Sequence, residues 1–281
     1  IQIRSGEQMI HKVLKSGECD SILRIGGIPT VRLWRDLEDR YKDVPVFSVG
    51  FNHFTGLSRP VSHCPSLDLL SQVEFATTHR ENFRLNVEDG ARTDQMRALL
   101  EKYPDSEQGQ IYTLSKQMKG QSVYLGNSLP IREWDSCADL DSPPARVAAN
   151  RGANGIDGQL STFLGWANNE HENWCLVGDL TAMYDLSSLW ATSQLGPQKL
   201  RIVVINNNGG QIFSRMFKKE IFINKHQISF ESWAKMWNWS YQQWHTIPTT
   251  MELADHQIIE LCPNAEQTQL FWKELEALWK E

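Results

Sequence analysis

Asp179 and Asn207 each follow a short apolar run, and their residue types suit the binding of a divalent cation. The runs are Trp174–Gly178 and Leu200–Ile205. The stretch between them, Thr181–Gln194, has the length of one helix, so we expect a strand–helix–strand unit with adjacent parallel strands. Such a unit places both polar side chains at the carboxyl edge of the sheet. A carboxylate, an amide oxygen and nearby loop carbonyls are hard ligands of the kind that Mg²⁺ prefers.

A simpler interpretation is that Asp179 only caps the following helix, because aspartate is a favoured residue at helix N-termini. Two features argue for more. A second polar cluster ends the next strand, and Gly209 and Gly210 follow it. Free backbone N–H groups at a glycine turn that opens a helix bind anions. We therefore predict a site for a metal ion together with a diphosphate.

The elements that must position these residues alternate between strand and helix patterns. This alternation predicts an α/β fold with a doubly wound, mostly parallel sheet. Polar residues at Tyr103–Ser106 mark the expected boundary between a smaller α/β domain over 1–104 and a second domain over 105–281. The other expected helices are 7–16, 31–42, 106–118, 157–169, a Trp-rich stretch around 233–239 and a closing segment to 281. The other expected strands are 21–27, 45–49, 83–89, 122–125, 146–149 and 257–261, with a loop from 126 to about 145.

The composition argues against several classes of protein. The chain has 281 residues, enough for one large or two ordinary domains, and its formal net charge of −6 without a basic run argues against nucleic-acid binding. The five cysteines lack CxxC spacing, so we expect reduced thiols of a cytoplasmic protein rather than a disulfide framework or a zinc site. No stretch has the apolar length needed for insertion across a membrane. The first residues read like the interior of a protein, so we expect a fragment or a processed chain.

The strand ends carry a motif that is similar to one in a known enzyme family. Gly178-Asp179-Leu180 is followed 28 positions later by Asn207, within Asn206-Asn207-Asn208-Gly209-Gly210, and this pattern resembles the thiamine-diphosphate motif. The resemblance implies that thiamine diphosphate binds here and that Mg²⁺, with Mn²⁺ as an alternative ion, is held by three groups. These groups are the side chains of Asp179 and Asn207 and the backbone oxygen of Gly209. Gly178, Leu180 and Gly210 flank the bound cofactor in this interpretation.

Four longer strings narrow the resemblance to one branch of that family. They are Gly126–Arg132, Asn150–Gly158, Val177–Leu186 and Asn206–Phe213. All four resemble the 2-succinyl-5-enolpyruvyl-6-hydroxy-3-cyclohexene-1-carboxylate synthases of menaquinone biosynthesis. The resemblance is strong over roughly 106–281 and weaker before it, where Leu23–Thr30 matches the later half of the family's central domain. It implies a decarboxylating carboligase that joins a four-carbon unit from 2-oxoglutarate to isochorismate.

The resemblance also implies roles for individual side chains. Ser128, Arg132 and Arg151 would position the carboxylates of the two substrates, because guanidinium groups hold carboxylates by two-point contacts. An arginine in a loop is otherwise most often a solvated charge. Ile156 would prop the cofactor into its bent, reactive shape, although the plain alternative is a core aliphatic residue. By the same resemblance, apolar walls beside the diphosphate and the substrate are Ile212 and Phe213, which are open to the same alternative.

The family forms its active sites between two subunits, so a homodimer or homotetramer is expected. Its activating glutamate lies in an N-terminal pyrimidine-binding domain, which we do not find in these residues, so we expect no turnover from this chain alone. Two alternatives stay open: another thiamine-diphosphate enzyme, such as an acetolactate-type carboligase or a 2-oxoacid decarboxylase, and a non-catalytic remnant of the fold.

We expect the tryptophans near 233–239 to be buried in a core or an interface. The histidines His11, His53, His63, His171 and His226 have no ligand-like spacing and receive no role.

Overall fold

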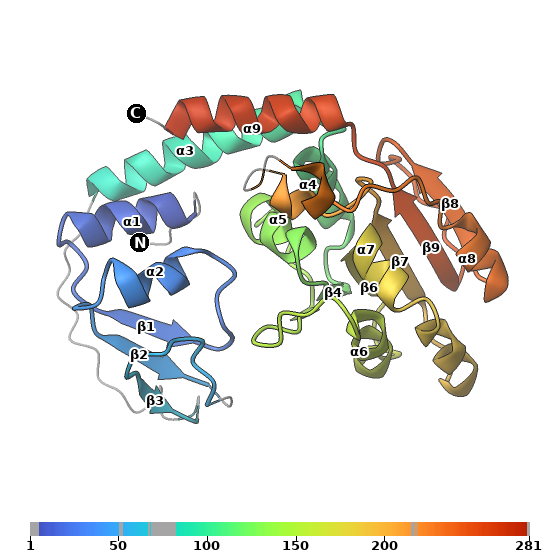
Figure 1. Ribbon diagram of the computed structural model, residues 1–281, viewed down its shortest axis with the longest axis horizontal. Coiled ribbons are helices and arrows are strands. Elements are labelled where there is room, and N and C mark those ends of the chain that lie inside the picture. Colours follow the sequence, from blue (N-terminus) through green and yellow to red (C-terminus); the bar gives the residue numbers. More distant parts are fainter. Residues whose placement is uncertain are drawn as a thin grey trace. The chain divides into compact units, whose positions relative to one another are not determined.

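The structure is a computed structural model that describes residues 6–50, 53–66, 68, 83–214, 217 and 219–279. It divides into two compact units, Ile1–Met96 and Arg97–Glu281. Each unit contains its own sheet, as the alternating strand and helix patterns predict (Figure 1). The assignment of 1–104 to a partial central domain and of 105–281 to a diphosphate-binding domain stays a prediction.

The first unit contains a small parallel sheet in the order β1-β2-β3. Trp34, Leu37 and Val46 form its core, and partly buried apolar residues from the strands and loops pack around them. The third strand was not expected, because it has only three residues and none is fully buried. The strands are β1 (Ile22–Ile25), β2 (Val46–Val49) and β3 (Ser62–Cys64), and the helices are α1 (Glu7–Lys15) and α2 (Leu33–Asp39).

The strand expected at 83–89 is wrong, because these residues begin the long helix α3 (Phe83–Lys102). The alternation of Phe83, Leu85 and Val87 is typical of a strand. In the helix, Leu85 is buried whereas Val87 is 56% exposed. The helix-forming residues that follow continue the helix to Leu99 and Leu100, which are both buried. A period of two over so short a stretch therefore does not separate a strand from the first turns of a helix.

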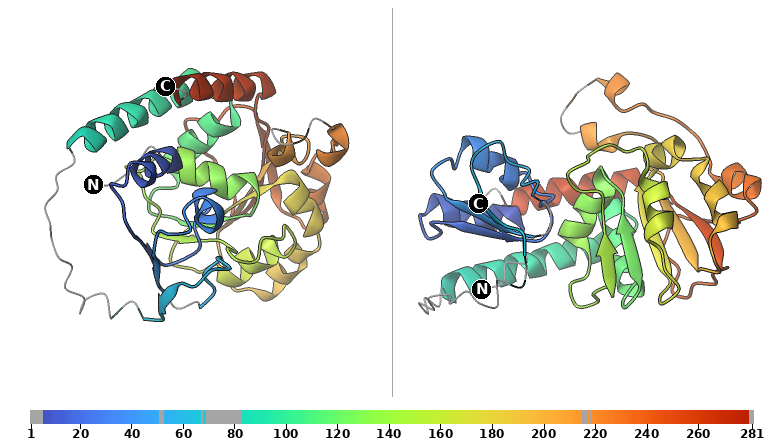
Figure 2. Two further views of the ribbon diagram at one scale, coloured as in Figure 1. Left: turned by 60° about the vertical axis from the view of Figure 1, so that its left-hand side comes forward. Right: turned by 90° about the horizontal axis from the view of Figure 1, so that it is seen from below.

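The second unit is built on a six-stranded sheet in the order β5-β4-β6-β7-β9-β8, in which every pair of neighbours is parallel. Figure 2 shows these strands next to one another. The expected doubly wound parallel sheet is therefore confirmed. The strands are β4 (Ser122–Leu125), β5 (Arg146–Ala148), β6 (Asn173–Gly178), β7 (Leu200–Ile205), β8 (Ser240–Trp244) and β9 (His256–Leu261).

Helices cover both faces of this sheet. On one face, Val177, Ile202 and Val204 pack against Phe163 and Trp233 in a core that includes residues of α6, α7, η2 and α8. Successive strand residues point to opposite faces, and on the other face α5 packs against β4 and β6 while α4 packs against α5 and α9. The helices are α4 (Glu107–Gln117), α5 (Leu129–Cys137), α6 (Gln159–Trp166), α7 (Asp179–Tyr184), α8 (Glu231–Met236) and α9 (Ala265–Trp279), with 3₁₀ turns η2 (Ser188–Gln194), η3 (Gln211–Phe213) and η4 (Glu220–Phe222).

Three details of the second unit differ from expectation. The loop expected after residue 126 contains helix α5, whose first turn includes Pro130, where proline is favoured. The single helix expected over Thr181–Gln194 is two pieces, α7 and η2, because the helix breaks at Asp185. Strand β8 was missed because it lies at the edge of the sheet, where only Trp244 of its residues is buried.

The tryptophan-rich stretch lies in the core, in agreement with one of the two expectations. Trp233 and Trp239 belong to the apolar core of the second unit, and Trp237 packs against it. The indole N–H groups of Trp233 and Trp237 both donate to the carbonyl of Leu186. Within the described part of the chain, no helix is long and apolar enough to cross a membrane.

Candidate functional site

Four neighbouring strands end at the same edge of the large sheet, and the predicted residues follow those ends. Along the order β5-β4-β6-β7, these residues are Arg151, Ser128, Asp179 and Asn207. Gly178 pairs with Ile205 in the register of β6 and β7. Asp179 and Asn207 therefore come one and two residues after the same level of the sheet. The predicted residues thus come from one continuous edge, which in open parallel sheets is the edge that binds ligands.

Asp179 opens helix α7 and reaches across to the turn that follows β7. Its Oδ1 accepts from the N–H of Leu180 (2.6 Å), and its Oδ2 accepts from the N–H of Gly209 (2.8 Å). The side chain is almost fully buried. Burial raises the pKa of Asp179, while the two N–H groups and the nearby His226 oppose that rise. Asp179 therefore does more than cap a helix, because one carboxylate oxygen accepts from the start of the helix and the other accepts from the turn after β7.

The turn after β7 requires glycine at position 209. Gly209 has φ of 133°, and a Cβ atom there would lie 2.4 Å from the backbone oxygen of Ile223. Any larger residue would push the segment 220–228 off the turn. Glycine at this position therefore allows that segment to lie directly on the strand end.

The anion cradle expected from free backbone N–H groups is not present in this conformation. The N–H of Gly209 donates to Asp179, that of Gly210 donates to the carbonyl of Ile223 (2.5 Å), and that of Gln211 donates to the carbonyl of Gly209 (2.9 Å). The N–H of Gly210 has this partner because the segment that carries Ile223 folds back over the turn, and diphosphate binding at the turn stays a prediction. Since a carbonyl has two lone pairs, the Gly209 oxygen keeps one for a further partner.

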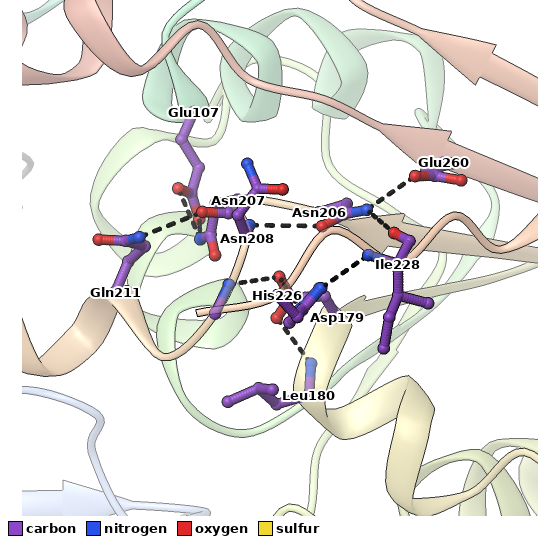
Figure 3. Close-up of polar contacts among 11 residues, drawn as sticks. Glu107, Asp179, Leu180, Asn206, Asn207, Asn208, Gln211, His226, Ile228 and Glu260 are labelled. Atoms are coloured by element: carbon purple, nitrogen blue, oxygen red, sulfur yellow. Dashed lines mark hydrogen bonds and ion pairs between the residues drawn. The ribbon is translucent and has the colours of Figure 1, made fainter. Parts of the chain in front are cut away.

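The side-chain amide of Asn207 has hydrogen-bond partners at its nitrogen but none among the described residues at its oxygen (Figure 3). Its Nδ2 donates to both carboxylate oxygens of Glu107, at 3.0 and 3.1 Å. Its backbone oxygen accepts from Nε2 of Gln211 (3.1 Å). Its Oδ1 is buried and has no hydrogen-bond partner among the described residues. A buried acceptor without a donor costs about 1–3 kcal/mol, so this oxygen is suited to a ligand that the chain itself does not supply.

Glu107 and Glu133 form a buried acidic pair next to Asn207, and neither was predicted. Burial raises the pKa of Glu107, and burial and the neighbouring Glu107 raise the pKa of Glu133 well above its usual range. Nε2 of Gln108 donates to Glu133 Oε1 (2.6 Å), whereas Oε2 of Glu133 is buried without a hydrogen-bond partner among the described residues. In the sequence, Glu107 looks like an ordinary acidic residue in the first turn of a helix, so no signal separated it from a solvated one.

His226 was also missed, because a lone histidine 19 positions after Asn207 follows no ligand pattern. Its Nε2 lies 3.1 Å from Asp179 Oδ2. The imidazole therefore occupies one side of the carboxylate that was predicted to bind a metal ion (Figure 3). It belongs to the same segment, 220–228, that bonds to the N–H of Gly210.

The arginines predicted to bind carboxylates lie close enough to influence each other. Burial and the charge of Arg151 lower the pKa of Arg132, and burial lowers the pKa of Arg151. The Nε of Arg151 is buried without a hydrogen-bond partner among the described residues. Arg132 donates to the carbonyl of Ser128, which precedes α5 in a left-handed conformation with φ of 78°. Two mutually repelling guanidinium groups with an unused donor suit an anionic ligand.

Ile156 lies in a loop that is tied to the end of β4. Nδ2 of Asn127 donates to the carbonyls of Ala153 (2.9 Å) and Gly155 (2.8 Å), which come shortly before this residue. The side chain of Ile156 is half-buried. The residue before helix α6 is Gly158, which has no side chain to cap it. The carboxylate of Asp185 accepts instead from the N–H groups of Gly158 and Leu160 at the start of α6.

The side chains of Leu180 and Phe213 both lie next to Gly210. A Cβ atom at Gly210 would be 3.5 Å from Cδ1 of Leu180 and 3.4 Å from Cδ2 of Phe213. Phe213 is 39% exposed, and Ile212 is half-buried. Two of the predicted apolar neighbours of the cofactor, Leu180 and Phe213, therefore lie at the glycine turn, and their contact with the cofactor stays a prediction.

The side chains present fit a hard divalent cation. Within the described ranges, no group of three or more His, Cys, Asp or Glu residues could hold a metal ion. The predicted set, however, contains only one carboxylate, together with an amide oxygen and a backbone oxygen. The unpartnered Oδ1 of Asn207 and the buried carboxylate of Asp179 are oxygen ligands of the type that Mg²⁺ prefers.

Comparison with known proteins points to one group of enzymes, although no protein-family model matches the chain. The whole chain is 76% identical to a 2-succinyl-5-enolpyruvyl-6-hydroxy-3-cyclohexene-1-carboxylate synthase of Bdellovibrio bacteriovorus, of which it covers 54%. The synthase of the same name from Akkermansia muciniphila is 36% identical over 88% of the chain and 49% of its own length. A third, from Lysinibacillus sphaericus, is 28% identical over 81% of the chain and 42% of its own length. The chain spans about half the length of the curated relatives it matches.

Proposed function

We propose that this chain, which is related over its whole length to the 2-succinyl-5-enolpyruvyl-6-hydroxy-3-cyclohexene-1-carboxylate synthases, supplies the diphosphate- and metal-binding half of such an enzyme. The observation that carries the proposal is the pairing of Asp179 and Asn207 at adjacent strand ends, with a buried amide oxygen that lacks a partner. The similarity to the named synthases supports the choice of enzyme within the thiamine-diphosphate family.

In the proposed complex, Mg²⁺ (or Mn²⁺) is bound by Asp179, Asn207 and the backbone oxygen of Gly209. Thiamine diphosphate supplies a nucleophilic carbon and an electron sink for the decarboxylation of a 2-oxoacid. Gly178, Gly210, Leu180, Ile212 and Phe213 surround its diphosphate end, and Ile156 supports its bent shape.

The arginine side of the sheet edge is proposed to bind the substrates. Arg132 and Arg151 hold the carboxylates of 2-oxoglutarate and isochorismate, and Ser128 lies beside them. The lowered pKa of both arginines does not remove their charge at neutral pH, since an arginine titrates far above it. The unused Nε of Arg151 supports this role, because a carboxylate would satisfy it.

The compartment, the oligomeric state and the need for a further domain are inferred from the same resemblance. We propose that it acts in the cytoplasm as a homodimer or homotetramer and that activity requires a pyrimidine-binding domain to supply the activating glutamate. The other thiamine-diphosphate enzymes stay as the alternative. Product formation that depends on isochorismate supports the proposed function, whereas product from pyruvate alone supports an acetolactate-type enzyme or a decarboxylase.

The binding half of the proposal is tested by calorimetry. We expect Mg²⁺ and thiamine diphosphate to bind together to the wild-type chain. Asp179→Ala should weaken this binding on the order of a hundredfold, because loss of even an indirect metal contact costs 10–100-fold. The matched control is Asp36→Ala, which removes another buried aspartate, in the first unit. Equal binding by wild type and Asp179→Ala would support a non-catalytic remnant instead.

A further inference from the structure

Asn206 and Asn207 are neighbours after strand β7, and each has its side-chain amide held by a buried glutamate (Figure 3). Nδ2 of Asn206 donates to Glu260 Oε1 (2.7 Å) and to the carbonyl of Ile228 (2.8 Å). Nδ2 of Asn207 donates to the two oxygens of Glu107 at 3.0 and 3.1 Å. Both glutamates are almost fully buried. On their donor sides, the two asparagines are therefore alike.

The two asparagines differ on their acceptor sides. Oδ1 of Asn206 accepts from the N–H of Asn208 (3.3 Å) and so closes a local turn. Oδ1 of Asn207 is buried, and none of the described residues donates to it. The first amide thus has a structural partner at both ends, whereas the second has a partner only at its donor end.

Glu107 is held in place from several directions. It is the first residue of α4, and the start of that helix is capped by Oγ of Ser106, which accepts from the N–H of Gly109 (2.9 Å). The N–H of Glu107 donates to Oγ1 of Thr268 in α9 (3.0 Å). Its carboxyl group is also near Glu133 of α5, whose pKa it raises. Helix packing therefore sets the position of this carboxylate, independently of the loop after β7.

We propose that Glu107 is a positioning residue that orients the amide of Asn207 toward the metal ion, an inference that rests on the proposed function. A carboxylate accepts hydrogen bonds, whereas an asparagine amide donates at one end and accepts at the other. Two contacts from Nδ2 to Glu107 select one of the two amide orientations. In that orientation, Oδ1 points away from the carboxylate and is left for the cation. The reversed amide would set Oδ1 against two carboxylate oxygens.

The first test is Glu107→Gln in the full 281-residue chain, with Mg²⁺ titrated in the presence of saturating thiamine diphosphate. Glutamine keeps the shape of glutamate, but either end of its amide can face Asn207, so the preferred orientation is lost. We expect the affinity for Mg²⁺ to fall about tenfold, as for other residues that orient metal ligands. Glu260→Gln is the matched control, because it makes the same change beside Asn206, and it should leave the affinity for Mg²⁺ unchanged.

A second background separates orientation from simple attraction between Glu107 and the cation. In Asn207→Asp, both oxygens of residue 207 are equivalent, so no orienting partner is needed, and Glu107 then repels the new carboxylate. If Glu107 acts by orientation, Glu107→Gln lowers the affinity for Mg²⁺ in the wild-type background and raises it or leaves it unchanged in the Asn207→Asp background. If Glu107 acts by charge alone, the loss is the same in both backgrounds, and the proposal is overturned. No loss in the wild-type background also overturns it.

The side-chain amide of Asn207 gives a readout that needs neither turnover nor a bound metal ion. In nuclear magnetic resonance spectra, the Nδ2 protons are identified by their disappearance in Asn207→Asp. We expect them to exchange slowly with solvent in the wild type and faster in Glu107→Gln, while melting temperatures show that the variants remain folded. Unchanged exchange would contradict the orienting role. If the wild type binds no Mg²⁺ and no thiamine diphosphate but shows this protection, the proposed function fails while the contact itself is verified.

Discussion

The two halves of the large sheet's carboxyl edge have opposite electrostatic character. At the ends of β5 and β4, burial lowers the pKa of Arg132 and of Arg151, the charge of Arg151 further lowers that of Arg132, and Nε of Arg151 has no acceptor among the described residues. At the ends of β6 and β7, burial raises the pKa of Asp179 and of Glu107, which contacts Asn207 from the start of α4, and the side-chain oxygen of Asn207 has no partner among the described residues. One half is suited to anions and the other to a cation. The proposed function uses both halves, with the metal-bound diphosphate at one and the carboxylates of the substrates at the other.

The strongest test of this contrast is Arg151→Ala. In the complete enzyme, we expect KM for a carboxylate substrate to rise about tenfold to a hundredfold, the value of a charge-assisted hydrogen bond. The affinity of the chain for Mg²⁺ and thiamine diphosphate should stay the same. Arg146→Ala is the control, because Arg146 is at the opposite end of β5 and stacks on Trp166. A parallel loss of cofactor affinity in Arg151→Ala would show that the two halves are not separable.

The acidic half should also change how the free energy of unfolding depends on pH. Glu133 faces Glu107 and the thiol of Cys137, and its folded-state pKa is well above the usual range, so the folded chain binds the extra proton. The free energy of unfolding should therefore fall as pH rises from the ordinary glutamate pKa toward the folded one. Glu133→Gln keeps a neutral side chain at every pH and should flatten this fall. Urea unfolding between about pH 5 and pH 8 measures it, and equal slopes for both proteins would contradict the assignment.

The smallest effect is expected from His226→Ala. The imidazole contacts Asp179 Oδ2, so its removal frees one side of a proposed metal ligand. We expect the affinity for Mg²⁺ to rise by a factor of about two to five, since one modest contact is lost. His171→Ala, which changes a histidine outside this cluster, serves as the control in the same calorimetric titration. A weaker affinity in His226→Ala would instead make this histidine a supporting residue of the site.

The sequence predicted the positions of the charged and amide groups better than their contacts. Asp179 and Asn207 could be placed because a parallel sheet determines which strand ends are neighbours. Glu107 and His226 could not, since each comes from an element that is distant in sequence and carries no spacing signal. The elements that were missed, β3, α5 and β8, are short, so periodicity gives little information about them. Local patterns thus predicted the sheet, whereas the partners of its polar residues depended on tertiary packing.

The contact between Gly210 and Ile223 has a consequence for the kinetics of ligand uptake. One amide proton serves one strong acceptor at a time, and in this conformation that acceptor is the Ile223 carbonyl. A phosphate oxygen that accepts a hydrogen bond from the N–H of Gly210 must first displace this carbonyl. Binding of a phosphate at this N–H is then an exchange of hydrogen-bond partners rather than binding to a free N–H group. The observed rate of uptake should then level off at high ligand concentration, at the rate at which the segment 220–228 lifts from the turn.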